Sequence, residues 1–309
     1  MSAQPKAPAS RKRLWRIAAA FAVLIGLAVY LVVQYVTGGP GAPHCLVQAE
    51  GDDKPYEVTP EQAANAATIS AVASSRGLPE RAVTIALATA MQESGLRNID
   101  FGDRDSVGLF QQRPSQDWGT VKQIMDPVYA AGEFYTHLAK VPGYSRLPLT
   151  AAAQKVQRSG YPQAYAKHEA NAARLTGALT GRDHAALVCS QSRPVDGKAG
   201  GVAAVREKLV REFGPEVLPR VAGAGGRAAA GERRVTVPVQ RDGAGADGDR
   251  TRRGWELASW AMAHSAELRI EQISYADRMW SAADAGKGWQ QRPDASGADT
   301  GGVRIITAQ

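Results

Sequence analysis

The sequence predicts an α+β protein with three structured parts: an N-terminal transmembrane helix, a mainly α-helical central domain and a small C-terminal α+β domain. One apolar run near the N-terminus, capped helical patterns in the middle and short β-rich segments at the end support this fold class. The predicted divisions are a basic tail over 1–16, a membrane segment over 17–36, a linker over 37–57, the helical domain over 58–190, a linker with a helix over 191–233, and the last domain over 234–309.

The N-terminal pattern is typical of an uncleaved signal anchor. Residues 17–36 are apolar apart from Gln34, which is long enough to cross a bilayer. Five basic residues precede the run, and basic residues stay on the cytoplasmic side. We therefore expect a single-pass cell-membrane protein with its N-terminus in the cytoplasm and its later domains outside the cell. A cleavable signal peptide is the alternative, but the run is long for one and no small-x-small cleavage site follows directly.

The charge distribution gives no reason to expect a nucleic-acid partner. The formal net charge is +7, but the tail before residue 17 carries five of the positive charges and no acidic residue. The rest of the chain is therefore only mildly basic, which is compatible with an anionic cell wall.

The two cysteines, Cys45 and Cys189, lie on either side of the helical region. In an oxidising compartment they are expected to form a disulfide that joins the two ends of the domain, with two free thiols as the alternative. The five histidines are scattered, without His-x-x-x-His or Cys-x-x-Cys spacing. The sequence therefore indicates no metal site and no cofactor.

Capping residues and apolar periodicity predict a series of helices in the central domain, beginning at residue 59. Thr59 is placed to cap a helix with Pro60 in its first turn and Gln62 reaching back, and this helix should end near Gly77. A second helix should run from Pro79 to Ser94, because its residues are almost all apolar and Gly95 suits a stop. Further helical patterns cover 126–140, 150–158 and 162–179, with an irregular or β-like wing after the second helix.

Glu93 is the candidate catalytic residue, because it places a carboxylate in the last turn of a buried helix. Ala90, Thr89 and Ala86 share its helical face, so the carboxyl group should be poorly solvated. Poor solvation and the negative end of the helix dipole both favour the protonated form, which can act as an acid near neutral pH. The alternative is a structural glutamate that caps the helix end or pairs with a nearby arginine.

Two motifs carry a resemblance to a known family. Gln92-Glu93-Ser94 and the later Gly108-Leu-Phe-Gln111 resemble the signature of the lysozyme-like superfamily, in particular soluble lytic transglycosylases and goose-type lysozymes. The similarity covers roughly residues 58–178. It implies a lysozyme-like fold in which Glu93 is the catalytic acid and base. It also implies a substrate-binding set: Ser94, Gly108, Leu109, Phe110, Gln111 and Gln112.

The family also supplies a tyrosine near the acid from an Ala-Tyr-Asn motif, which this chain lacks. The nearest candidates are Tyr161 and Tyr165. The substrate implied is the glycan strand of peptidoglycan. A transglycosylase needs no second carboxylate, whereas a hydrolytic lysozyme needs a base, for which the loop offers Asp100, Asp103 and Asp105. A catalytically inactive wall-binding or envelope scaffold protein remains the alternative from another class.

The last part of the chain predicts a strand over 235–240, an amphipathic helix over 253–268, and strands near 270–275, 278–280 and 303–306. Gly254-Trp255, Met279-Trp280 and Gly288-Trp289 make it similar to a C-terminal domain that high-GC bacteria append to wall-associated proteins. Relatives of that domain end in a histidine-rich strand, but residues 300–306 contain no histidine. The resemblance therefore implies a binding or spacing module, with a purely structural domain as the alternative.

Overall fold

The computed structural model describes residues 15, 19–30, 42–158, 162–190, 201–219, 232–239, 247–292 and 299–308. The chain divides into two compact units, residues 1–42 and residues 43–309. In the first unit, residues 19–30 form an α-helix.

The predicted transmembrane helix over 17–36 is wrong. Within the described ranges, no helix combines the length and the apolar character needed to cross a membrane. The fold class is corrected to mixed α and β, with no membrane-spanning helix in the part of the chain that the structure describes, and the single-pass membrane localisation that depended on such a helix is contradicted.

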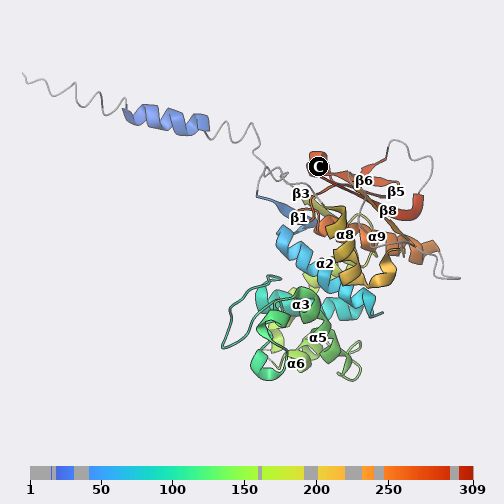
Figure 1. Ribbon diagram of the computed structural model, residues 1–309. Helices are drawn as coiled ribbons and strands as arrows, with labels where there is room; N and C mark the ends of the chain where they lie inside the picture. Colours follow the sequence, from blue (N-terminus) through green and yellow to red (C-terminus); the bar gives the residue numbers. More distant parts are fainter. Residues whose placement is uncertain are drawn as a thin grey trace, which may run out of the picture. The chain divides into compact units, whose positions relative to one another are not determined.

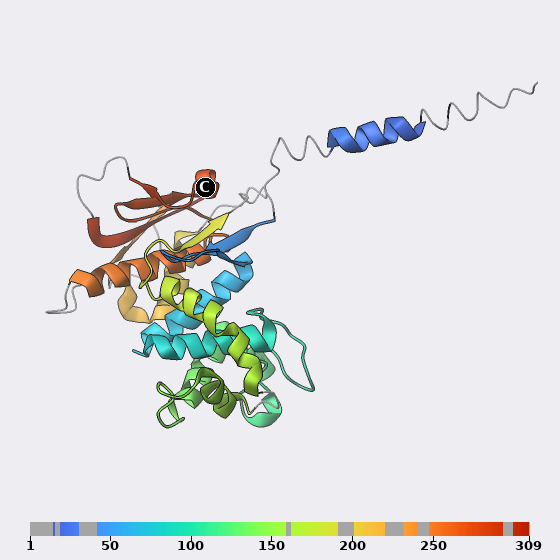
Figure 2. The same ribbon diagram turned by 180° about the vertical axis from the view of Figure 1, so that it is seen from behind.

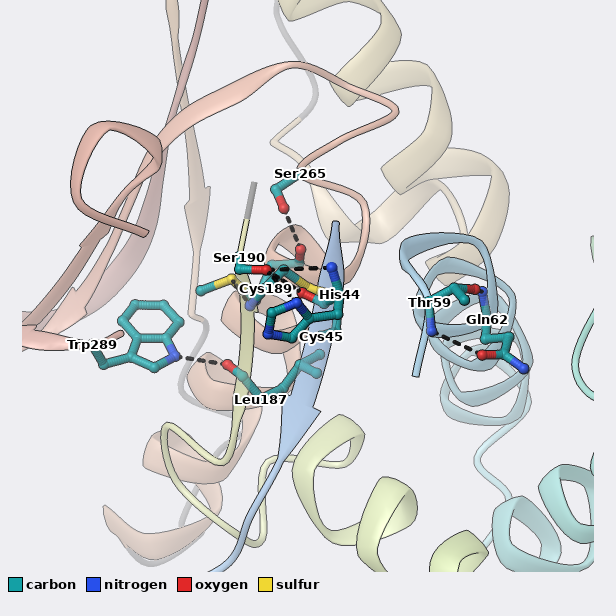
Figure 3. The surroundings of a disulfide bond; sticks show 10 residues. His44, Cys45, Thr59, Gln62, Leu187, Cys189, Ser190, Ser265 and Trp289 are labelled. Atoms are coloured by element: carbon teal, nitrogen blue, oxygen red, sulfur yellow. Dashed lines mark hydrogen bonds between the residues drawn. A yellow bond between two sulfur atoms is a disulfide. The ribbon is translucent and has the colours of Figure 1, made fainter. Parts of the chain in front are cut away.

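A three-stranded antiparallel sheet joins the two ends of the central region. Its strands are β1 (His44–Val47), β2 (Tyr56–Val58) and β3 (Leu187–Ser190), in the order β2-β1-β3. Cys45 lies directly opposite Cys189 in the β1–β3 register, and the two form a buried disulfide (Figure 3). The predicted disulfide between the ends of the helical region is therefore confirmed.

Between β2 and β3 the chain is helical (Figure 1). Helix α2 (Pro60–Ser75) starts at the predicted capping box of Thr59, and α3 (Glu80–Ser94) ends at Gly95 as predicted. The later elements are η1 (Pro114–Gln116), α4 (Val121–Ile124), α5 (Pro127–Ala139), α6 (Leu149–Gln157), η2 (Pro162–His168) and α7 (Glu169–Leu179). Helix α3 lies at the centre of the helical region, because α2, α5, α6 and α7 all pack against it and most of its residues are buried.

The C-terminal part adds two helices and a second sheet. Helix α8 (Val202–Phe213) and η3 (Pro215–Val217) precede β4 (Arg234–Pro238) and α9 (Asp247–Ala263). After α9 come β5 (Ile270–Ala276), β6 (Arg278–Ser281), η4 (Ala282–Lys287), β7 (Gln290–Gln291) and β8 (Asp299–Thr307). All paired strands are antiparallel, in the order β4-β8-β5-β6-β7.

Helix α9 connects this sheet to the central helices. It packs against β5 and β8 on the sheet side, and against α2 and α7 on the other (Figure 2). Trp289 adds a second link, because its indole Nε1 donates a 2.9 Å hydrogen bond to the carbonyl oxygen of Leu187 in β3. The β-rich end and the helical region therefore share one packed interior within residues 43–309.

Candidate active site

The end of helix α3 fixes the position of Glu93. Gly95 adopts a left-handed conformation with φ 65°, and the N–H of Leu96 donates to the carbonyl of Ala90 at 3.1 Å. These are the contacts of a tight helix stop, which glycine at this position permits without strain. Glu93 thus lies in the last helical turn, half-buried, at the negative end of the helix dipole.

Side chains of helix α2 satisfy the carbonyl groups at this helix end. The Gln62 amide nitrogen donates to the carbonyl of Gly95 at 2.8 Å, and Asn65 donates to the carbonyl of Leu96 at 2.8 Å. Gln62 also accepts the backbone N–H of Thr59 through its Oε1 atom (Figure 3). The carbonyls after Glu93 are therefore held by protein groups rather than by water alone.

The turn over Gly108–Gln111 lies beside the end of α3. A pair of backbone hydrogen bonds between Val107 and Gln112, both 3.0 Å, closes this turn as a small antiparallel bridge. Gly108 has φ 78°, and a Cβ atom there would lie 2.8 Å from the carbonyl oxygen of Ile124. Glycine is thus required at this position by both conformation and space.

Ser94 fastens the turn to the helix. Its hydroxyl donates to the carbonyl oxygen of Leu109 at 2.8 Å and lies 3.1 Å from the carbonyl of Ala90. The side chain is buried, so Ser94 links the end of helix α3 to the Gly108–Gln111 turn by a buried hydrogen bond.

Tyr165 and Gln157 approach the Glu93 carboxylate from two other elements. The Tyr165 hydroxyl of η2 donates to Glu93 Oε1 at 2.7 Å, and its ring is fully buried. Gln157, the last residue of α6, donates from Nε2 to the carbonyl oxygen of Phe110 at 2.7 Å. The structure thus brings one of the two candidate tyrosines to the acid, together with an amide that sequence reasoning did not single out.

The electrostatics of Glu93 combine two opposing effects. Burial raises the pKa of its carboxyl group, while hydrogen bonds from Tyr165 and Gln157 lower it, and the net direction is upward from the ordinary value. A carboxyl group with a raised pKa keeps its proton closer to neutral pH than an exposed glutamate does. It can therefore donate a proton to a bound substrate and then accept one.

The other predicted substrate-binding residues differ in where their side chains lie. Leu109 and Phe110 are fully buried, and Phe110 stacks on Phe134 with ring centroids 4.6 Å apart. Gln112 is also buried and donates to the carbonyl of Ala130 at 3.0 Å. Gln111 is partly exposed and donates to the carbonyls of Phe101 and Gly108 at 3.3 Å each. These residues therefore shape the turn mostly through backbone and packing contacts, and Tyr161 lies outside the described residues.

The loop aspartates lie in two environments. Asp105 accepts hydrogen bonds from the Arg113 guanidinium at 2.8 Å and from the backbone and hydroxyl of Ser115, and these contacts hold its pKa well below the ordinary value. Asp100 and Asp103 are exposed. The carboxylate of Asp105 thus stabilises the loop through these hydrogen bonds, and its low pKa makes it a poor proton acceptor.

A second polar cluster lies away from Glu93, where α2, α8 and the end of α9 meet. The buried Glu212 accepts from Thr68 at 2.9 Å and from the Trp260 indole at 2.7 Å, and it lies 3.5 Å from His264. The other imidazole nitrogen of His264 lies 3.1 Å from Glu267. Thr68, Glu212, His264 and Glu267 border a cavity of about 510 Å³, where Lys208 lies 3.2 Å from each of the two carboxylates.

The opposing charges of this cluster shift the pKa values of Glu212, His264 and Glu267. Burial alone would lower the pKa of His264, but the two carboxylates raise it. For Glu212, burial favours the neutral form, yet His264, Lys208 and Trp260 together lower its pKa. The hydrogen bond from His264 lowers the pKa of Glu267 to about 2. The cluster is therefore an internally paired charge network that ties three helices together.

The C-terminal part of the chain is similar to a known protein family. Residues 199–301 match the family model of the VldE C-terminal domain. No match to the chain was found among curated proteins. The VldE-like segment begins before α8 and ends within β8, so it contains α9 and the Glu212–His264 pair and starts beyond the helices that carry Glu93.

Proposed function

We propose that this protein cleaves the glycan strands of peptidoglycan between N-acetylmuramic acid and N-acetylglucosamine, as a lytic transglycosylase with Glu93 as general acid and then base. The observation that carries the proposal is the environment of Glu93: a half-buried carboxyl group with a raised pKa, in contact with Tyr165 and beside the Gly108–Gln111 turn. The motif resemblance of residues 58–178 adds the substrate class.

In the first step, the protonated Glu93 carboxyl group gives its proton to the glycosidic oxygen, and the bond from that oxygen to the anomeric carbon of the muramic acid residue breaks. A hydroxyl of the same muramic acid residue then attacks the anomeric carbon. The Glu93 carboxylate accepts the proton of that hydroxyl, which leaves an anhydro sugar and restores the acid. Tyr165 stabilises the carboxylate between the two steps through its hydrogen bond.

The single-acid mechanism is favoured over hydrolysis by the contacts of Asp105. A hydrolase needs a free carboxylate to activate water across the scissile bond. Asp105 is bound instead by Arg113 and Ser115, and its lowered pKa makes it a weak base. Asp105 is therefore a poor candidate for that base, whereas Asp100 and Asp103 are exposed, and the identity of the product decides between an anhydro sugar and a reducing end.

The test is digestion of purified peptidoglycan by the full chain, with the products identified by mass spectrometry. We expect anhydro-muropeptides from the wild type, and a loss of at least about 100-fold in rate for Glu93→Gln, since general acid catalysis typically contributes 10²–10⁴-fold. Glu57→Gln is the matched control, because it makes the same change at an exposed strand residue. Equal activity of the wild type and Glu93→Gln would refute the assignment of Glu93, and reducing-end products would move the protein to the hydrolases.

A further inference from the structure

Phe101 is an exposed aromatic residue in the loop that follows helix α3. Its side chain is part of a residue that is 68% exposed, and this loop projects from the helical region (Figure 1). Among the described residues of 58–190, no other aromatic residue is largely exposed. Phe134 and Tyr135 are buried, and Trp118 is only 8% exposed. These three rings therefore serve the packing of the core, whereas Phe101 offers its ring to solvent.

Hydrogen bonds fix the backbone around Phe101 to the turn beside the end of α3. The N–H of Gly108 donates to the carbonyl oxygen of Ile99 at 2.6 Å, and Gln111 Nε2 donates to the carbonyl oxygen of Phe101 at 3.3 Å. Gly102 packs directly against the Gln111 side chain, since a Cβ atom at this glycine would lie 1.9 Å from Gln111 Oε1. The ring therefore belongs to a segment whose position relative to the turn is defined.

The far side of the loop is also fixed. The Asp105 carboxylate accepts a hydrogen bond from Arg113 Nε at 2.8 Å and another from the backbone N–H of Ser115 at 2.8 Å. The N–H of Ser106 donates to the carbonyl oxygen of Asp103 at 3.0 Å. A ligand that covers a preorganised aromatic side chain restricts little further motion, because such a side chain has only two torsions. The loop thus presents an apolar surface that is suited to binding.

We propose that Phe101 is a substrate-binding residue that stacks on a pyranose ring of the glycan strand. The C–H groups on the face of a pyranose ring pack against the electron-rich face of an aromatic ring and leave the sugar hydroxyls free for polar partners. Asp100 and Asp103 lie close to Phe101 in the sequence, are exposed and supply acceptors for such hydroxyls. The inference rests on the proposed function for the identity of the ligand, and adds a contact that binds the strand without taking part in the chemistry.

The first test measures binding by isothermal titration calorimetry, with the full chain carrying Glu93→Gln so that no bond is cleaved. The probe is a soluble oligosaccharide of alternating N-acetylglucosamine and N-acetylmuramic acid. We expect Phe101→Ala to weaken binding about tenfold, the usual size of the effect of losing one aromatic contact. Phe101→Trp keeps an aromatic face and should bind within about threefold of the parent. Val121→Ala, which shortens another exposed apolar side chain, is the control and should leave binding unchanged.

The second test measures peptidoglycan cleavage by Phe101→Ala with Glu93 intact. A contact made equally with substrate and transition state raises KM and leaves kcat unchanged, so KM should rise about tenfold. Unchanged binding and unchanged KM in Phe101→Ala overturn the role of Phe101 and keep the proposed function. Binding that depends on Phe101 in a protein that does not cleave peptidoglycan keeps that role and refutes the proposed function. A chain that neither binds nor cleaves the glycan refutes both.

Discussion

Removing the Cys45–Cys189 disulfide should cost a large part of the stability of this protein. The bond closes a loop with a sequence separation of 144 residues, for which the loop-entropy model gives about 5 kcal/mol of stabilisation through the unfolded state. Natural domains are typically stable by only about 5–15 kcal/mol, so the loss would be a major fraction of the total. The double variant Cys45→Ala/Cys189→Ala should therefore unfold at much lower urea concentrations.

The assay is equilibrium urea unfolding of the wild type and the double variant, each with and without a thiol reductant. The slope m should rise in the double variant, because an unfolded chain without the cross-link exposes more surface. The chain has only two cysteines, so the reductant should leave the double variant unchanged. Val47→Ala/Leu187→Ala alters a neighbouring cross-strand pair, and should lower stability without the change in m. A loss below about 1 kcal/mol in the double variant would refute the loop-entropy reasoning.

Three further predictions follow from the polar groups. Glu212→Ala should lower the free energy of unfolding by about 3–5 kcal/mol in urea titrations, because it removes the buried one of the two carboxylates that pair with His264; a neutral effect would count against the network. Because folding raises the pKa of His264, protonated His264 stabilises the folded state fully below about pH 6.5. This contribution to the free energy of unfolding is lost as the pH rises through the folded-state pKa. The fall in stability of the wild type at alkaline pH should therefore be smaller in His264→Gln. Asp105→Asn should retain peptidoglycan cleavage within about tenfold, measured by muropeptide release, whereas a catalytic base would lose 100-fold or more.

Much of the helical framework could be predicted because its signals are local. Thr59, Pro60 and Gln62 define the start of α2 within four residues, and Gly95 defines the end of α3 within one. The helix predicted within 191–233 was also confirmed, as α8 (Val202–Phe213). The prediction over 162–179 was only partly right, because the chain forms the 3-10 helix η2 before α7.

The contacts that complete the site could not be predicted, because they join residues far apart in the sequence. Gln157 meets Phe110 across 47 positions, and Tyr165 meets Glu93 across 72. No period or spacing in the sequence singles out that glutamine among the others of the same region. The partners of Glu212, which come from α2 and α9, were hidden for the same reason. The predicted membrane span fails although its signal is local, because no helix among the described residues is both long and apolar enough to cross a membrane.

The double role of Gln62 affects how the protein opens locally. The side-chain oxygen of Gln62 accepts the N–H of Thr59 at the start of α2, and its nitrogen donates to the carbonyl of Gly95 at the end of α3. Fraying at either helix end therefore breaks a contact that supports the other. Amide hydrogens at the first turn of α2 and at the last turn of α3 should therefore exchange with solvent in one cooperative event. Transient exposure of the segment around Glu93 would then be governed by a glutamine three residues into another helix.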